Sequence, residues 1–283
     1  MAQGSARRGL RPPRVQRPQD GPRRAPAREI ELGGDQIEGR RAVFEALRAN
    51  RRTVREVWFD AGLERTGLVS EIAHLALQRG VPLIEVTNAR FDRTVRSDSS
   101  QGVLAFAEPL RDLTLVELVK SCRRQPALIL LDHVTDPRNL GAILRSAECA
   151  GFEGIVIAER RSTKVTPTVT KTSAGAVEYL RFAMVGGVPA AIEELKALGV
   201  WIVGLDPAGS QEIFDVELLT EPLALVLGSE GKGLSRLVRE RCDVVATIPQ
   251  SGSIASLNVS AAASVACFAV QRARTARHLL PSR

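Results

Sequence analysis

Several features that assign a chain to a specialised class are missing from this sequence of 283 residues. No apolar stretch reaches the roughly 18 residues that a membrane-spanning helix needs, so we expect no transmembrane segment. The four cysteines lie far apart without a CxxC pair, and the three histidines lack the spacing of metal ligands. These absences predict a cytoplasmic protein that has reduced, mostly buried cysteines and no structural zinc.

Unbalanced charge is also missing from most of the chain. The formal net charge is +7, and residues 1–28 account for all of it, because they hold eight arginines and one acid. Five prolines and few apolar side chains predict that this tail, which we extend to residue 35, is disordered; it lacks the apolar core of a secretory signal. Arginine-rich arms commonly contact RNA by displacing counterions from phosphates, although a solubility tail or a mis-assigned start codon explains the same composition.

The sequence after the tail predicts two α/β parts. Residues 36–109 alternate between helix and strand, with helical spacing at 39–50 and 67–80 and strand-like runs in "REVWFDA", "PLIEVT" and "GVLAFAEP". Residues 110–126 are predicted to form a linker that carries one amphipathic helix, "LTLVELVKSC". The first part is therefore expected to be a compact module with a small sheet.

Residues 127–283 show a more regular pattern. Six short apolar runs predict strands: "ALILLD", "GIVIAE", "LRFAMV", "WIVGLD", "LALVLG" and "VVATIP". Because polar residues hardly interrupt these runs, they are typical of parallel strands that are covered on both faces. Helical segments such as "NLGAILRSAECAG" and "VPAAIEELKALG" lie between them. The pattern predicts an α/β domain whose ligands collect beyond the carboxyl ends of the strands.

The loop after "ALILLD" leads into the first of these helices. Asn139 is a good N-cap residue, and an apolar stripe follows it. Arg145 lies off this stripe and can therefore face a ligand, although most arginines in such positions are simply solvated.

Two further loops at strand ends are rich in glycine or serine. The loop "GSEGKGLS", residues 228–235, holds three glycines that let backbone amides approach a ligand closely. Its order matches neither GxxxxGK[ST] nor GxGxxG, and Glu230 would repel a phosphate, so the loop suits an adenosine or a cationic ligand. A plain strand-to-helix turn is the alternative. The other loop, "IPQSGSIASLNVS", places serines and Asn258 between a strand and a helix that are both apolar.

Together these segments carry a family resemblance. "NLGAILRSA", "LVLGSEGKGLS" and "IPQSGSIASLNVSAAASV" resemble the three signature motifs of the SpoU/TrmH (SPOUT) family of S-adenosylmethionine-dependent RNA ribose 2′-O-methyltransferases. "IEGRRAVFEAL" and "SQGVLAFAEP" resemble the first helix and the last strand of a ribosomal-protein-L30e-like RNA-binding domain. That domain is found in the bacterial branch that modifies large-subunit ribosomal RNA. The resemblance covers residues 36–274.

The resemblance implies a fold, a cofactor and an assembly. The C-terminal domain is expected to tie a deep trefoil knot, with the Gly/Ser/Asn segment threaded among the other loops and Gly252 keeping its backbone slim. S-adenosylmethionine is expected to lie against Gly228, Ile248 and Leu257. Family members work as homodimers through the knotted domain, and the helix "SAAASVACFAV" is apolar enough for that interface or, equally, for an internal core.

The resemblance also implies the roles of individual residues. It gives the central role to Arg145, with Asn139, Glu230, Ser256 and Asn258 around it. Because the pKa of arginine lies above about 12, we expect Arg145 to bind the phosphate beside the target ribose rather than to remove a proton. The predicted target is a guanosine of 23S rRNA. A tRNA, an adenosine of ribosomal RNA, or RNA binding without catalysis are the alternatives.

Overall fold

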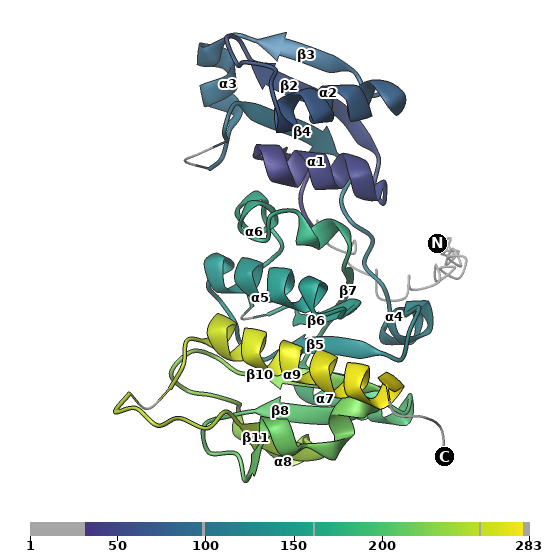
Figure 1. Ribbon diagram of the computed structural model, residues 1–283, viewed down its shortest axis with the longest axis vertical. Helices are drawn as coiled ribbons and strands as arrows, with labels where there is room; N and C mark the ends of the chain where they lie inside the picture. The colour runs from purple at the N-terminus through teal and green to yellow at the C-terminus, as the bar shows by residue number, and fades with distance from the viewer. Residues whose placement is uncertain (1–31, 98–99, 161, 255, 280–283) are drawn as a thin grey trace, which may run out of the picture. The chain divides into compact units, whose positions relative to one another are not determined.

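The computed structural model describes residues 32–97, 100–160, 162–254 and 256–279 (Figure 1). The predicted disorder of residues 1–28 and their predicted contact with RNA lie outside these ranges. The described part begins inside the segment that the sequence assigned to the tail. Leu32 is buried and pairs with Leu110 through a β-bridge, and Gly33 donates its N–H to the carbonyl of Val165. Residues 32–35 are therefore packed, which corrects the predicted boundary.

The N-terminal domain is built around a mixed sheet in the order β1-β4-β2-β3. Strands β2 and β3 are parallel, and β4 runs antiparallel to both β1 and β2. Helices α1 and α2 cover one face around Phe59 and Ile72, while α3 covers a smaller cluster around Trp58 on the other. The elements are β1 (Gln36–Glu38), α1 (Arg40–Ala49), β2 (Val54–Asp60), α2 (Leu68–Gln78), β3 (Leu83–Val86), α3 (Asn88–Thr94) and β4 (Val103–Ala107).

The connector carries the predicted amphipathic helix as α4 (Leu115–Ser121). Thr114 caps its first turn: its hydroxyl accepts the N–H of Glu117, and the carboxylate of Glu117 accepts the N–H of Thr114 in return. Leu115 and Leu118 are buried in the core of the C-terminal domain. The connector helix therefore belongs to that core.

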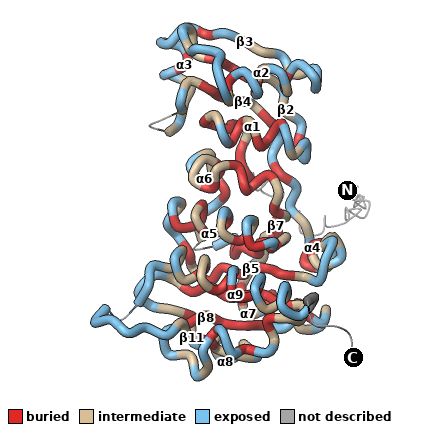
Figure 2. Tube along the Cα trace, in the orientation of Figure 1, coloured by how far each residue is buried: buried red, intermediate tan, exposed pale blue. Residues whose placement is uncertain are grey.

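The C-terminal domain is an α/β domain with a seven-stranded sheet in the order β7-β6-β5-β10-β8-β11-β9, in which every pair is parallel. All six predicted strands are present, and β5, β6 and β10 are buried along their whole length (Figure 2). The strands are β5 (Ala127–Leu131), β6 (Gly154–Ala158), β7 (Arg181–Val185), β8 (Trp201–Leu205), β9 (Gln211–Glu212), β10 (Leu223–Leu227) and β11 (Val244–Thr247).

Helices cover both faces of this sheet. Helices α4, α7 and α8 share one core with it, whereas α5 and α9 pack side by side over the other face (Figure 1). Ser146 of α5 and Ser264 of α9 join the two helices through a hydrogen bond of 2.8 Å between their hydroxyls. The helices are α5 (Pro137–Cys149), α6 (Pro167–Thr172), α7 (Val188–Ala197), α8 (Arg236–Arg241) and α9 (Val259–Leu279), with short 3-10 turns η1 (Ala176–Glu178), η2 (Ile213–Asp215) and η3 (Glu217–Thr220).

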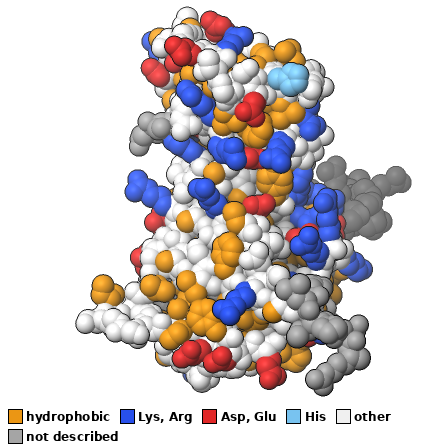
Figure 3. Space-filling model, viewed as in Figure 1, with side chains coloured by type: hydrophobic (Ala, Val, Ile, Leu, Met, Phe, Trp, Pro, Cys, Tyr) orange, Lys and Arg blue, Asp and Glu red, His pale blue; other side chains and the backbone are white. Residues whose placement is uncertain are grey.

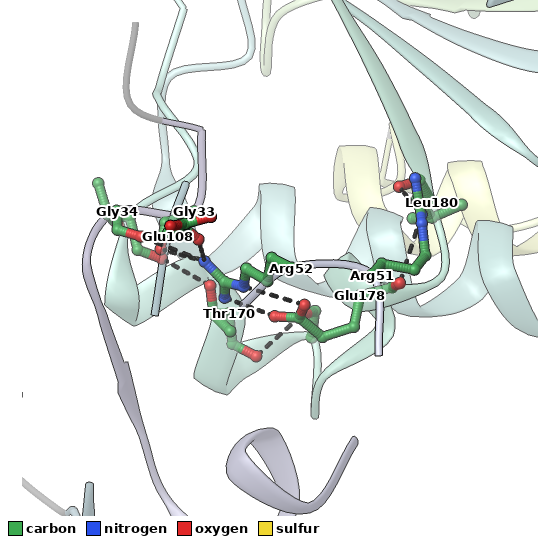
Figure 4. A network of polar contacts seen from close by, with 10 residues as sticks. Gly33, Gly34, Arg51, Arg52, Glu108, Thr170, Glu178 and Leu180 are labelled. Carbon is green, nitrogen blue, oxygen red and sulfur yellow. Dashed lines mark hydrogen bonds and ion pairs between the residues drawn. The ribbon is translucent and has the colours of Figure 1, made fainter. Parts of the chain in front are cut away.

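A buried ion pair links the two domains (Figure 4). The side chains of Arg52, which follows α1, and Glu178, in η1, are 1% and 0% exposed. The Arg52 guanidinium binds both carboxylate oxygens, with N···O distances of 3.1 and 2.5 Å. Its third nitrogen donates to main-chain carbonyls, including that of Gly34 at 3.1 Å. The guanidinium therefore has a partner on every side, as burial of a charge requires.

Candidate functional site

A cavity of about 230 Å³ lies at the carboxyl ends of β8, β10 and β11. These strands are neighbours in the sheet, and because they are parallel, the loops that follow them meet at one edge. Residues 205–208 and 227–233 supply most of the wall, together with Thr247, Ile248, Gln250, Ser256, Leu257 and Val259 from the last loop. All three loops that the sequence singled out therefore contribute to one region, two of them to this cavity and the first to the polar cluster beside it.

The cavity depends on close approaches of the main chain. A Cβ atom on Gly228 would lie 2.2 Å from the carbonyl carbon of Gly233, and one on Gly209 would lie 2.4 Å from that of Ala246. Gly233 also has a φ of +65°, which favours glycine. Gly252 has no neighbour within 4 Å of such an atom and is exposed. The prediction that a glycine is needed at residue 252 for the chain to pass between other loops is therefore wrong. Gly228 and Gly209 are the positions where the absence of a side chain lets two main-chain segments lie close together.

The walls of the cavity are mostly apolar. Gly228, Ile248 and Leu257, the three residues that the family resemblance assigned to the cofactor, all line it, and Ser256 does so too. Leu257 is 42% exposed, so its apolar side chain can contact a ligand bound in the cavity.

A buried carboxylate, Asp206, fixes the loops around the cavity. It accepts the N–H groups of Ala208 at 2.9 Å and Leu234 at 3.0 Å, and its Oδ2 lies 2.6 Å from the guanidinium of Arg239. The loop after β8 is thereby joined to the loop after β10 and to α8. Asp206 was not among the predicted site residues, although its position directly after the strand "WIVGL" is the signal that identifies it.

Three predicted site residues form a polar cluster beside the cavity. Asn258 donates to the side-chain oxygen of Asn139 at 3.1 Å, and Asn139 donates to Glu230 at 3.2 Å. Asn258 also lies 3.4 Å from the second oxygen of Glu230. The side-chain oxygen of Asn258 accepts the N–H of Ser260 in the first turn of α9, which fixes its amide. Glu230 therefore accepts from two oriented amides and keeps free lone pairs for a ligand.

Asn139 has this role because it does not cap the helix. The N-cap of α5 is Asp136, whose carboxylate accepts the N–H of Arg138 at 2.8 Å, and Pro137 occupies the first helical position. The predicted cap at Asn139 is wrong by one turn. Its side chain is 8% exposed and points instead to Glu230.

Arg145 is separated from this cluster. It lies six residues after Asn139 on α5, which places it about 9 Å further along the helix axis and on another side of it. It is exposed and lines a second hollow of about 740 Å³. Among the residues that the structure describes, no hydrogen bond or ion pair joins Arg145 to Asn139, Glu230 or Asn258. Within one chain, the structure does not bring Arg145 to the other predicted catalytic residues.

Comparison with known proteins identifies the family of this chain. Residues 126–268 match the SpoU rRNA methylase family, and residues 36–113 match the substrate-binding domain of RNA 2′-O ribose methyltransferases. The chain is 37% identical over 238 residues to the 23S rRNA (guanosine-2′-O-)-methyltransferase RlmB of Ralstonia nicotianae, covering 84% of this chain and 95% of that protein. The chain belongs to the SpoU family. It is therefore an RNA 2′-O-ribose methyltransferase.

Other relatives of this SpoU methyltransferase cover similar lengths. The putative TrmH family tRNA/rRNA methyltransferase YacO of Bacillus subtilis is 36% identical over 85% of this chain and 96% of its own length. The crystal structure of the SpoU methyltransferase AviRb from Streptomyces viridochromogenes, in complex with AdoMet, superposes with a TM-score of 0.71 and 26% identity. It covers 85% of this chain and 90% of that one. The SpoU enzyme described here has no helix, within its described ranges, that is long and apolar enough to cross a membrane.

Proposed function

We propose that this SpoU methyltransferase methylates the 2′-hydroxyl of a guanosine in 23S rRNA, with S-adenosylmethionine as methyl donor, in the cytoplasm. The cluster of Asn139, Glu230 and Asn258 beside a glycine-walled cavity is the observation that supports catalysis most directly. The choice of RNA is supported by near-full-length similarity to two RlmB enzymes, from Ralstonia and from Pseudomonas putida, both named for a 23S rRNA guanosine.

The cavity has properties that fit S-adenosylmethionine. Apolar side chains and glycine main chain suit a purine and its sugar, and Glu230 on the wall suits a cationic group better than a phosphate. Gly228, Ile248 and Leu257 would hold the adenosine. The cofactor, when bound, supplies a methyl group that is already activated as a sulfonium. The protein must therefore orient the acceptor hydroxyl and assist the loss of its proton.

The polar cluster suits that second task. Glu230, oriented by Asn139 and Asn258, has lone pairs that can accept a hydrogen bond from the ribose, and Ser256 offers a hydroxyl on the same wall. Arg145 remains cationic and has the planar geometry that matches a phosphate. We assign to it a phosphate of the substrate, whose charge it neutralises while the hydroxyl reacts.

We further propose that the enzyme is a homodimer. The face of α9 that carries small side chains packs within the protein's own core, since Ala263, Ala266 and Cys267 are buried. Phe268 of the same helix is 45% exposed and remains available to a second copy. Sedimentation of the purified protein tests this proposal, and a monomer at all concentrations would contradict it.

The proposed reaction is tested with labelled S-adenosylmethionine and unmodified RNA. We expect methyl transfer to 23S rRNA and no transfer to bulk tRNA, with the label mapping to the ribose of one guanosine. Transfer to tRNA or to a ribosomal adenosine would overturn the substrate assignment. RNA binding without transfer would overturn the assignment of catalysis.

A further inference from the structure

The second hollow, of about 740 Å³, is lined by six arginines and is here called the arginine cleft. They come from both domains and from the connector between them. Two lie on α1 and one lies two residues after its end. The connector, α5 and β7 supply one each. The six are Arg41, Arg48, Arg51, Arg123, Arg145 and Arg181. On the face shown in Figure 3, basic side chains gather over α1 and α6, whereas hydrophobic ones gather lower, over α9.

Carboxylates do not balance these arginines. The cleft is lined by three glutamates, half the number of arginines. Glu45 is shared, because Arg41 lies 3.2 Å and Arg48 3.7 Å from its two oxygens, and the hydroxyl of Tyr179 also donates to it. The wall therefore keeps a positive excess that no side chain lining it neutralises.

Arg181, the most buried arginine of the cleft, is paired with Glu153 at 3.0 Å, whereas the more exposed Arg51 shows the excess most clearly. The guanidinium of Arg51 donates to the carbonyls of Glu178 at 3.3 Å and Leu180 at 2.6 Å and makes no ion pair among the described side chains (Figure 4). Burial, and then repulsion from the neighbouring guanidinium of Arg181, lower the pKa of Arg51 from its ordinary value. The carboxylate of Glu178 raises the pKa of Arg51, and repulsion from Arg123 lowers it again. Like charges that line one hollow form a site that an anion would stabilise.

We propose that the arginine cleft binds the phosphodiester backbone of the substrate RNA, an inference that rests on the proposed function. RNA is favoured over an acidic protein because of where the arginines come from. Arg41, Arg48 and Arg51 belong to the segment that matches substrate-binding domains, and Arg145 and Arg181 to the methylase segment. Arg145 also shares α5 with Asn139 of the polar cluster. A backbone held here is bound by both domains at once, and α5 joins the cleft to the polar cluster.

The test removes one arginine from each side of the cleft. The double variant Arg48→Gln/Arg123→Gln keeps side-chain size and leaves the main-chain contacts of Arg51 intact. Each lost phosphate contact reduces the slope of log affinity against log salt by about 0.7 to 0.9, so the slope should fall by about 1.4 to 1.8. At about 0.1 M salt this corresponds to a 25- to 60-fold weaker affinity for an unmodified 23S rRNA transcript.

A second double variant serves as the matched control. Arg65→Gln/Arg236→Gln also removes two arginines and the same net charge, but both residues are exposed and lie outside the cleft. We expect its RNA affinity to stay within about threefold of the unchanged protein, because long-range charge alone is screened. Equal losses in the two double variants would overturn the proposal, as would an unchanged salt slope in the cleft variant.

A cofactor measurement separates this proposal from the proposed function. Calorimetric binding of S-adenosylmethionine should be the same in both variants and in the unchanged protein, since the cavity has no residue in common with the cleft. If the unchanged protein binds the cofactor and methylates 23S rRNA while the cleft variant keeps full RNA affinity, only the cleft proposal fails. If the unchanged protein neither binds the cofactor nor transfers methyl groups, the proposed function fails first.

Discussion

The two hollows of this enzyme are built by opposite means. The cavity at the ends of β8, β10 and β11 is small, mostly apolar and shaped by glycine main chain from one domain. The arginine cleft is about three times larger, lined by long charged side chains, and drawn from both domains. A small cofactor is recognised by main-chain shape, which one sheet edge can supply, whereas a polyanion is recognised by charge spread over distance. The two hollows should therefore respond to different mutations.

The largest effect is expected where the two domains are joined. Glu178→Gln leaves the buried guanidinium of Arg52 without its counter-charge, which typically costs about 3–5 kcal/mol. The melting temperature should fall by roughly 6–20 °C in a thermal scan, and RNA affinity should fall with it while cofactor affinity holds. Glu85→Gln, which breaks the exposed pair with Arg65, is the control and should cost no more than about 1 kcal/mol. Similar melting temperatures for the two variants would contradict the role given to the buried pair.

Arg145→Ala should have the next largest effect and should act only through the cleft. Single-turnover methyl transfer should slow by at least about 10²-fold, the scale of losing one well-placed catalytic group. Arg145→Lys should recover little, because a point charge does not replace a planar, two-pronged contact to phosphate. The exposed position of Arg145 predicts an unchanged melting temperature and cofactor affinity. A near-normal rate for Arg145→Ala in a dimeric sample would show that Arg145 is a solvated surface residue.

Leu257→Arg tests the other hollow. A charge placed against the apolar wall has no partner there, so affinity for S-adenosylmethionine should fall at least about 10-fold. Affinity for RNA should be unchanged or slightly higher. Leu77→Arg, at an exposed leucine on α2, controls for the added charge. Calorimetry that finds equal cofactor affinity in the two variants would remove Leu257 from the cavity wall.

Thr114→Ala is expected to have the smallest effect and to leave both hollows intact. It removes the capping box of α4, which is worth about 1 kcal/mol, so the melting temperature should fall by roughly 2–4 °C. Affinities for cofactor and RNA should not change. A loss of RNA affinity in this variant would indicate that the connector helix also positions the cleft.

Much of the fold could be predicted because the sheet is buried on both faces. Six short apolar runs, hardly interrupted by polar residues, became six parallel strands of four or five residues each in the C-terminal domain. The pattern failed for β1, whose two outer residues, Gln36 and Glu38, are polar yet buried and bonded to each other at 2.9 Å. It also failed for β9, which has only two residues. Short or polar strands are recognisable only once their partners are in place.

The site was predictable to the extent that it depends on loops at strand ends. Gly228, Glu230, Ser256 and Leu257 lie at the same edge because parallel strands require it. The position of Arg145 was not predictable from its neighbours in sequence, because helix geometry turns it away from Asn139. The arginine cleft could not be anticipated at all. Its residues are scattered from 41 to 181, and only folding brings them together.

The central position of β10 has a consequence for how the protein is made. Leu223 of β10 pairs with Ala127 of β5, nearly a hundred residues earlier in the chain. During synthesis β5, β6 and β7 are made before β10 and can pair with one another. The other edge of β5 stays unpaired until β10 has been synthesised. Pairing between strands that are distant in sequence forms slowly. Until it forms, the unpaired apolar edge can associate with other chains. Production of this enzyme should therefore benefit from chaperones that shield the unpaired edge of β5 until β10 is made.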